Sequence, residues 1–168
     1  MKTKYIIIVI VCFVILSVCL YLIKIFLKNK DQIVDFDKEI LNSFYLTYSN
    51  GYAANSYTRY KLSIIDGLYT VEIKPYGEHE DNTYKTTVDN SFINKLTAIL
   101  KKYEVNKWNG FKESNQNVLD GDSFSLSINF SNNKSINASG YMVWPNNYRN
   151  VTSDISKLFM EIYNKKMS

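Results

Sequence analysis

The chain has 168 residues, of which 46% are hydrophobic, 21% are charged and 15% are aromatic, a composition typical of a folded protein. Its net charge of +4 does not indicate nucleic-acid binding. Residues 1–30 hold five lysines and no acidic residue, and the remainder balances 15 basic against 16 acidic groups. Both cysteines, Cys12 and Cys19, lie in the N-terminal segment, which excludes a disulfide, a thiol nucleophile or a cysteine metal site from the remainder.

The chain begins with an apolar segment whose nineteen residues from Tyr5 to Ile23 carry no charge. As a helix this segment would span about 28 Å, close to the ~30 Å hydrocarbon core of a bilayer. We therefore expect residues 1–30 to form an uncleaved membrane anchor that contacts the lipid bilayer through residues 5–27. The stretch Leu16–Cys19 resembles a lipobox, so a lipoprotein acylated at Cys19 is the alternative.

Lysines flank this apolar segment on both sides, and the positive-inside rule therefore gives nearly equal weight to two orientations. A short basic tail ahead of an apolar run is typical of an export signal, and a cysteine-free domain suits an oxidising exterior. We expect a single-pass protein of the cell membrane whose C-terminal domain is extracytoplasmic. A domain that faces the cytoplasm is the alternative.

A short polar tether is expected over residues 31–36, followed by one globular domain over residues 37–168, enough chain for a single core. Alternating apolar residues predict its first strands, and the dipeptide Asp66-Gly67 favours a two-residue hairpin turn between two of them. The expected strands in this part cover residues 42–50, 60–65, 68–74 and, as a short addition, 83–88.

The apolar period then becomes helical over residues 92–103, with Asp89, Asn90 or Ser91 as the candidate cap. A strand pair follows over residues 123–130 and 135–140, and a closing amphipathic helix begins near Tyr148. The predicted order is β-β-β-(β)-α-β-β-α. It indicates an α+β fold in which an antiparallel sheet is covered on one face by two helices.

Four short motifs in the second half of the chain are similar to those of a known protein family. They are Trp108-Asn109-Gly110-Phe111, Leu119-Asp120-Gly121-Asp122-Ser123-Phe124, Ile136-Asn137-Ala138-Ser139-Gly140 and Trp144-Pro145-Asn146-Asn147-Tyr148. Together, over roughly residues 92–163, they resemble an uncharacterised family of membrane-anchored proteins or lipoproteins of low-GC Gram-positive bacteria. The resemblance implies a membrane location. It implies no activity, ligand or catalytic residue.

The sequence offers few candidates for a metal-binding or catalytic site. His79 lies among Glu78, Glu80 and Asp81, but one imidazole rarely makes a transition-metal site, and a solvated acidic loop is the better interpretation. The stretch Asp120–Asp122 begins like a calcium loop, yet the position of the bidentate glutamate is occupied by a serine, which favours an ordinary turn. We expect no metal and no cofactor.

Aromatic residues provide the remaining candidates. Twelve of the fourteen tyrosines lie outside the N-terminal segment, many of them between Tyr45 and Tyr60. Tyrosine suits sugar stacking or protein interfaces, while strand propensity explains the same excess more simply. The loop around Trp144 and Pro145 leads into the last helix, and loops on a rigid scaffold often carry binding groups. The candidate ligand-binding residues are Trp144, Tyr141, Asn146, Asn147 and Tyr148; the alternative is that Trp144 closes the end of the sheet as a core residue.

The sequence therefore predicts a membrane-anchored, extracytoplasmic binding or interaction module rather than an enzyme, because no catalytic constellation is recognisable in it. Its partner would be a protein or a cell-wall glycan, and not a nucleic acid. A cell-envelope enzyme that processes glycans with two carboxylates is the alternative, although no motif selects such a pair.

Overall fold

The structure is a computed structural model that describes residues 14–24, 34–49, 51 and 56–167. Contacts divide the chain into two units, Met1–Ile33 and Val34–Ser168. In the first unit, residues 14–24 are helical and include Ile23 and the exposed Cys19, whereas Tyr5 and Cys12 lie outside the described residues. Within the described ranges, no helix has both the length and the apolarity needed to cross a bilayer.

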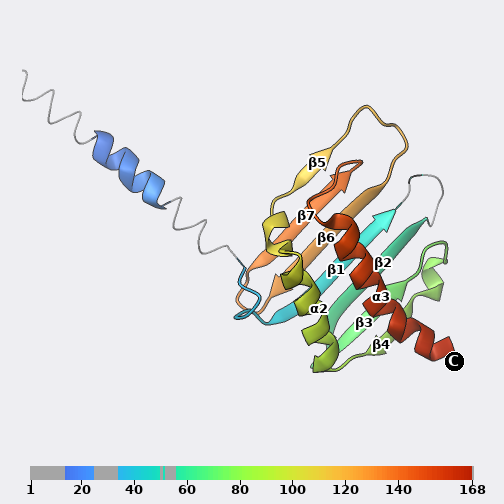
Figure 1. Cartoon of the computed structure of the whole chain (residues 1–168). Helices are drawn as coiled ribbons and strands as arrows, with labels where there is room; N and C mark the ends of the chain where they lie inside the picture. The colour runs from blue at the N-terminus through green and yellow to red at the C-terminus, as the bar shows by residue number, and fades with distance from the viewer. Residues whose placement is uncertain (1–13, 25–33, 50, 52–55, 168) are drawn as a thin grey trace, which may run out of the picture. The chain divides into compact units, whose positions relative to one another are not determined.

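The second unit is an α+β domain with one mostly antiparallel sheet (Figure 1). Its described part holds seven strands in the spatial order β4-β3-β2-β1-β6-β7-β5. The elements in chain order are β1 (Leu41–Ser49), β2 (Tyr57–Ile65), β3 (Leu68–Lys74), the 3-10 helix η1 (Glu80–Asn82), β4 (Tyr84–Thr87), α2 (Asn90–Lys102), the 3-10 helix η2 (Val105–Trp108), β5 (Lys112–Ser114), β6 (Ser123–Phe130), β7 (Ser135–Tyr141) and α3 (Tyr148–Met167).

The predicted α+β class of the domain and its predicted order of strands and helices are confirmed, with one addition. Strand β5 pairs with β7 in parallel, with Glu113 opposite Gly140, where the sequence predicted only a polar loop. Its three residues are all exposed and show no apolar alternation, so no pattern marked them. The predicted turn at Asp66-Gly67 is present, with φ of 52° and 77°, and Asp89 caps α2 by accepting a hydrogen bond from the backbone N–H of Phe92 at 3.1 Å.

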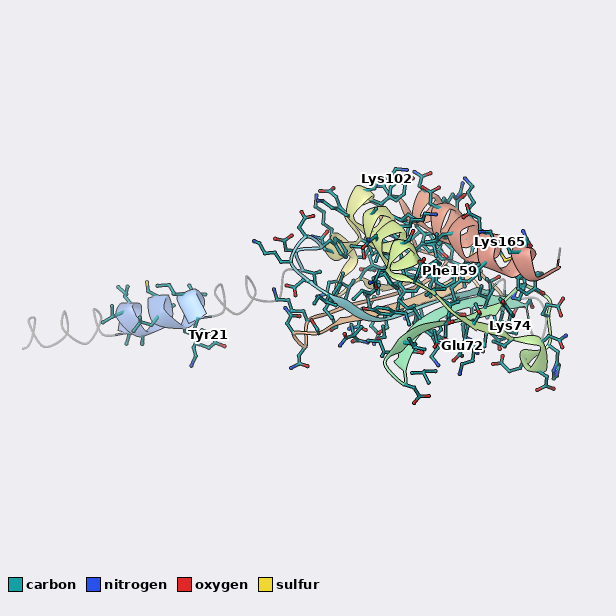
Figure 2. The ribbon with its side chains drawn as sticks, turned by 90° about the horizontal axis from the view of Figure 1, so that it is seen from below. Tyr21, Glu72, Lys74, Lys102, Phe159 and Lys165 are labelled. Carbon is teal, nitrogen blue, oxygen red and sulfur yellow. The ribbon has the colours of Figure 1, made fainter. Side chains whose placement is uncertain are left out.

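Helices α2 and α3 lie on the same side of the sheet (Figure 2). On the helix-covered face, apolar residues of the central strands pack against both helices, and Phe159 of α3 stacks on Tyr60 with ring centroids 4.8 Å apart. Val34 and Phe36, which the sequence placed in the tether, are buried in this core, and Phe36 packs on Phe130. The domain therefore begins at Val34.

The opposite, open face of the sheet is polar. Its β1, β6 and β7 positions carry small hydroxyl and amide side chains that bond across the strands, such as Ser127 to Asn137 at 2.9 Å and Asn129 to Ser43 at 2.9 Å. Towards β3 and β4 the face becomes charged, and Lys61 pairs with Glu72 at 3.1 Å. No described helix covers this face, and Figure 2 shows Glu72 on the side away from the helices.

The two ends of the sheet, the entry end and the far end, differ in the segments that they hold. The entry end holds the start of β1, the β2–β3 turn and the β6–β7 turn, and the first residues of the domain meet it where Phe36 packs on Phe130. The far end holds the end of β1, the start of β6 and the loop that leads from β7 into α3.

Candidate functional site

A cleft of about 300 Å³ lies at the far end of the helix-covered face, where α3 begins. Tyr48 of β1 lines the cleft from the helix-covered face, and Ser49 and Ser123, which lie opposite each other at the ends of β1 and β6, line its edge. Four aromatic and two charged side chains line it: Tyr48, Tyr76, Trp144, Tyr148, Asp122 and Arg149. This volume is at the lower limit for small-molecule sites, which suits a small ligand or one unit of a longer one.

Trp144 and Tyr148 form the main aromatic surface of the cleft. Their rings stack with centroids 4.7 Å apart and planes at 19°. Phe124 supports both, at 4.8 Å from Tyr148 and 5.8 Å from Trp144. Gly140 makes room for Phe124, because a Cβ at Gly140 would lie 2.5 Å from the Phe124 ring and 2.2 Å from the Val143 carbonyl oxygen. The core thus fixes the orientation of the pair.

Hydrogen bonds to its backbone carbonyl oxygens hold the loop before α3 in place. Asn147 adopts a left-handed conformation with φ of 64°, and its carbonyl oxygen accepts from the backbone N–H of Val151 at 3.0 Å. The indole N–H of Trp108 donates to the Asn146 carbonyl oxygen at 3.0 Å, which ties the loop to η2. Asn146 and Asn147 expose their side chains in a second groove of about 350 Å³, behind Trp144. The structure thus places Trp144 in both cavities, and the two asparagines only in the second.

Tyr141 holds a neighbouring loop and is not among the residues that line either cavity. Its hydroxyl donates to the carbonyl oxygens of Val118 and Leu119, at 3.2 and 2.9 Å. Next to it, the Met142 N–H donates to the Asp122 carbonyl oxygen at 2.9 Å, and the Asp122 N–H contacts the Met142 sulfur at 3.1 Å. These bonds position Asp122 at the rim of the cleft.

The electrostatics of the cleft combine one exposed anion, Asp122, with one exposed cation, Arg149. Burial, followed by the nearby Tyr48 and Asp122, raises the pKa of the Tyr148 phenol above its usual range. Tyr148 therefore stays protonated at neutral pH. The cleft offers a ligand a carboxylate acceptor, guanidinium donors and stacked aromatic faces.

The acidic loop around His79 has a structural role. The His79 Nδ1 accepts a long bond from the Asp81 N–H at 3.4 Å and lies 3.1 Å from a carboxylate oxygen of Asp81, so it caps η1. Glu80 instead bonds Tyr57 and Arg59, and these hydrogen bonds hold the pKa of Glu80 below its usual range. Across the described ranges, no three histidine, cysteine, aspartate or glutamate residues gather as a metal site would require.

The tyrosine-rich segment divides between the two faces of the sheet. Tyr48 lines the cleft, and Tyr60 is buried on α3 with its hydroxyl 2.9 Å from the Ser156 hydroxyl. Tyr57 and Tyr45 alternate to the other face, where Tyr57 bonds Glu80. Tyr52 lies outside the described residues.

Two of the candidate residues from the sequence, Trp144 and Tyr148, line the cleft, and Tyr76, Arg149 and Asp122 line it without having been candidates for a binding site. Tyr76 follows β3, and Asp122 precedes β6, so the fold alone brings them together. Comparison of the sequence with protein-family models and with curated proteins found no significant match.

Proposed function

We propose that the chain is a single-pass membrane-anchored binding module, whose extracytoplasmic domain holds a cell-envelope glycan in the aromatic cleft. The observation that carries the proposal is the stacked Trp144–Tyr148 pair with Asp122 and Arg149 on the same cleft. Flat aromatic faces suit the apolar C–H faces of sugar rings, while a carboxylate and a guanidinium suit their hydroxyl groups.

The membrane part of the proposal is supported by the uncharged run from Tyr5 to Ile23 and by its lysine flanks. The resemblance to membrane-anchored proteins of low-GC Gram-positive bacteria agrees with it. Protease added to intact cells should remove the domain and leave the anchor. Protection in intact cells with cleavage after lysis would reverse the orientation, and a mass increase at Cys19 would identify a lipoprotein.

The glycan is tested by titrating the full chain, in detergent micelles, with soluble peptidoglycan fragments while its tryptophan emission is recorded. Because Trp144 forms one wall of the cleft, we expect saturable changes in its emission. Arg149→Ala and Tyr76→Ala should each weaken binding about tenfold, which corresponds to roughly 1.4 kcal/mol. Tyr45→Ala, on the open face, is the matched control and should bind as the parent does.

Absence of binding at millimolar fragment concentrations, with a protein that unfolds cooperatively, would contradict the glycan proposal. Loss of binding in Tyr45→Ala but not in Arg149→Ala would move the site to the open face. Neither result contradicts the proposed membrane anchor, because the anchor is tested separately by adding protease to intact cells.

A carboxylate enzyme acting on the same glycans is the second candidate, because Asp122 stands at the rim of the cleft. Among the described lining residues Asp122 is the only carboxylate, whereas glycoside hydrolysis normally uses two, about 5–10 Å apart. Prolonged incubation with peptidoglycan should therefore release no new reducing ends. Release that is abolished by Asp122→Asn would establish the enzyme instead.

A further inference from the structure

Large apolar side chains are exposed together at the entry end of the domain. Ile40 is 63% exposed and Leu68 is 59% exposed, and Ile64 and Ile65 are exposed beside the β2–β3 turn. We call these four residues the apolar tip. Leu68 lies opposite Ile65 in the β2–β3 pair, which keeps these two residues together.

A hydrogen bond joins the hairpin to the start of β1. Tyr69, which lies opposite Ile64, donates from its hydroxyl to the Leu41 carbonyl oxygen at 2.9 Å. Ile40, the residue before Leu41, is therefore adjacent to the hairpin. The exposed apolar side chains thus come from two segments about 25 residues apart in sequence, and strand alternation places Ile64 on the helix-covered side of the hairpin end and Ile65 and Leu68 on its open side.

Such a surface is unfavourable in water unless something covers it. Single exposed apolar residues are ordinary, but a cluster of three isoleucines and a leucine at one corner is not. Two lysines close to Ile40 in the chain or in the sheet are paired in the domain, Lys38 with Asp35 at 3.1 Å and Lys134 with Glu39 at 2.9 Å, whereas Lys95 and Lys165 line a cavity together with Leu68. The four side chains of the tip carry no charge themselves, which favours their burial in an apolar or interfacial environment.

The chain path indicates what covers the tip. The first residues of the domain reach the sheet at this same end, where Phe36 packs on Phe130. Ten residues, 24–33, separate Ile23 from Val34, and an extended chain of that length spans at most ~35 Å. With an anchor in the membrane, the entry end of the domain cannot leave the neighbourhood of the lipid.

We propose that the apolar tip docks into the interfacial layer of the bilayer, so that the aromatic cleft faces away from the membrane. The inference rests on the proposed anchor and adds a second, weaker lipid contact made by the domain itself. The carboxylate of Asp66 at the turn keeps the contact shallow, in the headgroup region. The nine residues of β1 separate the two ends by about 30 Å, and the cleft then opens into the cell envelope.

The test places a fluorophore at each end of the full chain. With Cys12→Ala and Cys19→Ala as background, NBD is attached to Leu68→Cys at the tip, and in a second protein to Leu119→Cys at the far end. Leu119 is 95% exposed, so both labels begin in water. Each protein is reconstituted into phosphatidylcholine vesicles, and flotation of the vesicles first establishes whether the chain is membrane-bound.

We expect the label at position 68 to emit at shorter wavelength with vesicles than in their absence, and to be quenched by lipids spin-labelled near the headgroup. The label at position 119 should show neither effect. Ile65→Gln in the position-68 protein should reduce the shift by at least half without changing flotation, because Ile65 is exposed and its replacement leaves the core intact.

The outcomes separate the two proposals. A chain that does not float overturns the anchor, and the docking with it. A chain that floats while both labels emit as in water overturns the docking and leaves the anchor intact. A shift at position 68 that lipid quenchers do not affect, and that grows with the protein-to-lipid ratio, assigns the tip to a second copy of the chain and also overturns the docking.

Discussion

The two faces of the sheet are built from the same strands and perform different tasks. In β6, Phe124, Leu126 and Ile128 are buried under the helices, while Ser125 and Ser127 alternate to the open face. The helix-covered face provides the stability of the domain, and it also carries the cleft where α3 begins. The side chains that line the cleft are therefore continuous with the core, whereas the open face presents small polar side chains that bond across the strands.

The largest expected change in stability follows from truncating a leucine in the core under the helix-covered face. Leu126→Ala and Leu158→Ala should each destabilise the domain by about 2–5 kcal/mol, because both side chains are buried and each deletion leaves a cavity. Ser125→Ala, the open-face neighbour, should change stability by less than about 0.5 kcal/mol. Urea unfolding of the full chain in micelles, followed by tryptophan emission, measures all three. If Ser125→Ala proved the most damaging, the two faces would be inverted.

Gly140 offers a second test that links the core to the cleft. Gly140→Ala should cost about 1–3 kcal/mol, because the new methyl group would overlap the Phe124 ring and the Val143 carbonyl. Displacement of Phe124 should also disturb the Trp144–Tyr148 stack and weaken ligand binding. Ser139→Ala, one residue earlier and on the open face, is the control. Equal unfolding midpoints for the two variants would show that Phe124 can move without cost.

The alternation that separates the faces was readable in the sequence, because apolar residues recur at every second position in β1, β2 and β6. Strand β5 could not be read from the sequence, since its three residues are all exposed, show no apolar alternation, and pair with β7 only in the folded domain. Val34 and Phe36 were missed as core residues because a lone apolar residue in a polar stretch is buried only when a distant partner, here Phe130, receives it.

Only some of the residues that line the cleft could be predicted from the sequence. The Trp-Pro-Asn-Asn-Tyr stretch indicated an ordered loop that carries Trp144 and Tyr148, and both line the cleft. Tyr76 and Arg149 carry no local signal, because their position depends on the sheet order that brings the end of β3 near the start of α3. The asparagines of the stretch turned out to border a different groove.

The two tryptophans distinguish the core of the covered face from the cleft at its end. Trp108 is 3% exposed and bonds the Asn146 carbonyl oxygen, whereas Trp144 is only half-buried. Trp144→Phe, which leaves Trp108, should emit at shorter wavelength and resist acrylamide. Trp108→Phe, which leaves Trp144, should be quenched more readily, and a saturating ligand should protect it. Equal quenching of the two variants would place Trp144 in the core rather than in a binding wall.

The smallest expected change in stability comes from two carboxylates, one on each side of the sheet. Asp154 joins the two helices by accepting from the Tyr103 hydroxyl at 2.8 Å and from the Lys102 ammonium at 3.1 Å, and these hydrogen bonds lower its pKa. On the open side, Tyr57 and Arg59 lower the pKa of Glu80 in the same way. Because each folded-state pKa lies below the unfolded value of about 4, protonation favours unfolding.

The stability that these two carboxylates contribute is therefore complete above about pH 5, begins to decrease near pH 4, and is lost as the pH falls through the lowered folded-state pKa values. Asp154→Asn and Glu80→Gln should each be slightly less stable than the parent at pH 7, and the difference should be smaller at pH 3, below the unfolded-state pKa values. Unfolding in urea at both pH values measures it, and the other acidic groups cancel because parent and variant share them. Both sites are partly open to solvent, so the gap at pH 7 should be far below that of Leu126→Ala. A gap that persists unchanged at pH 3 would mean that packing, and not charge, makes these side chains stabilising.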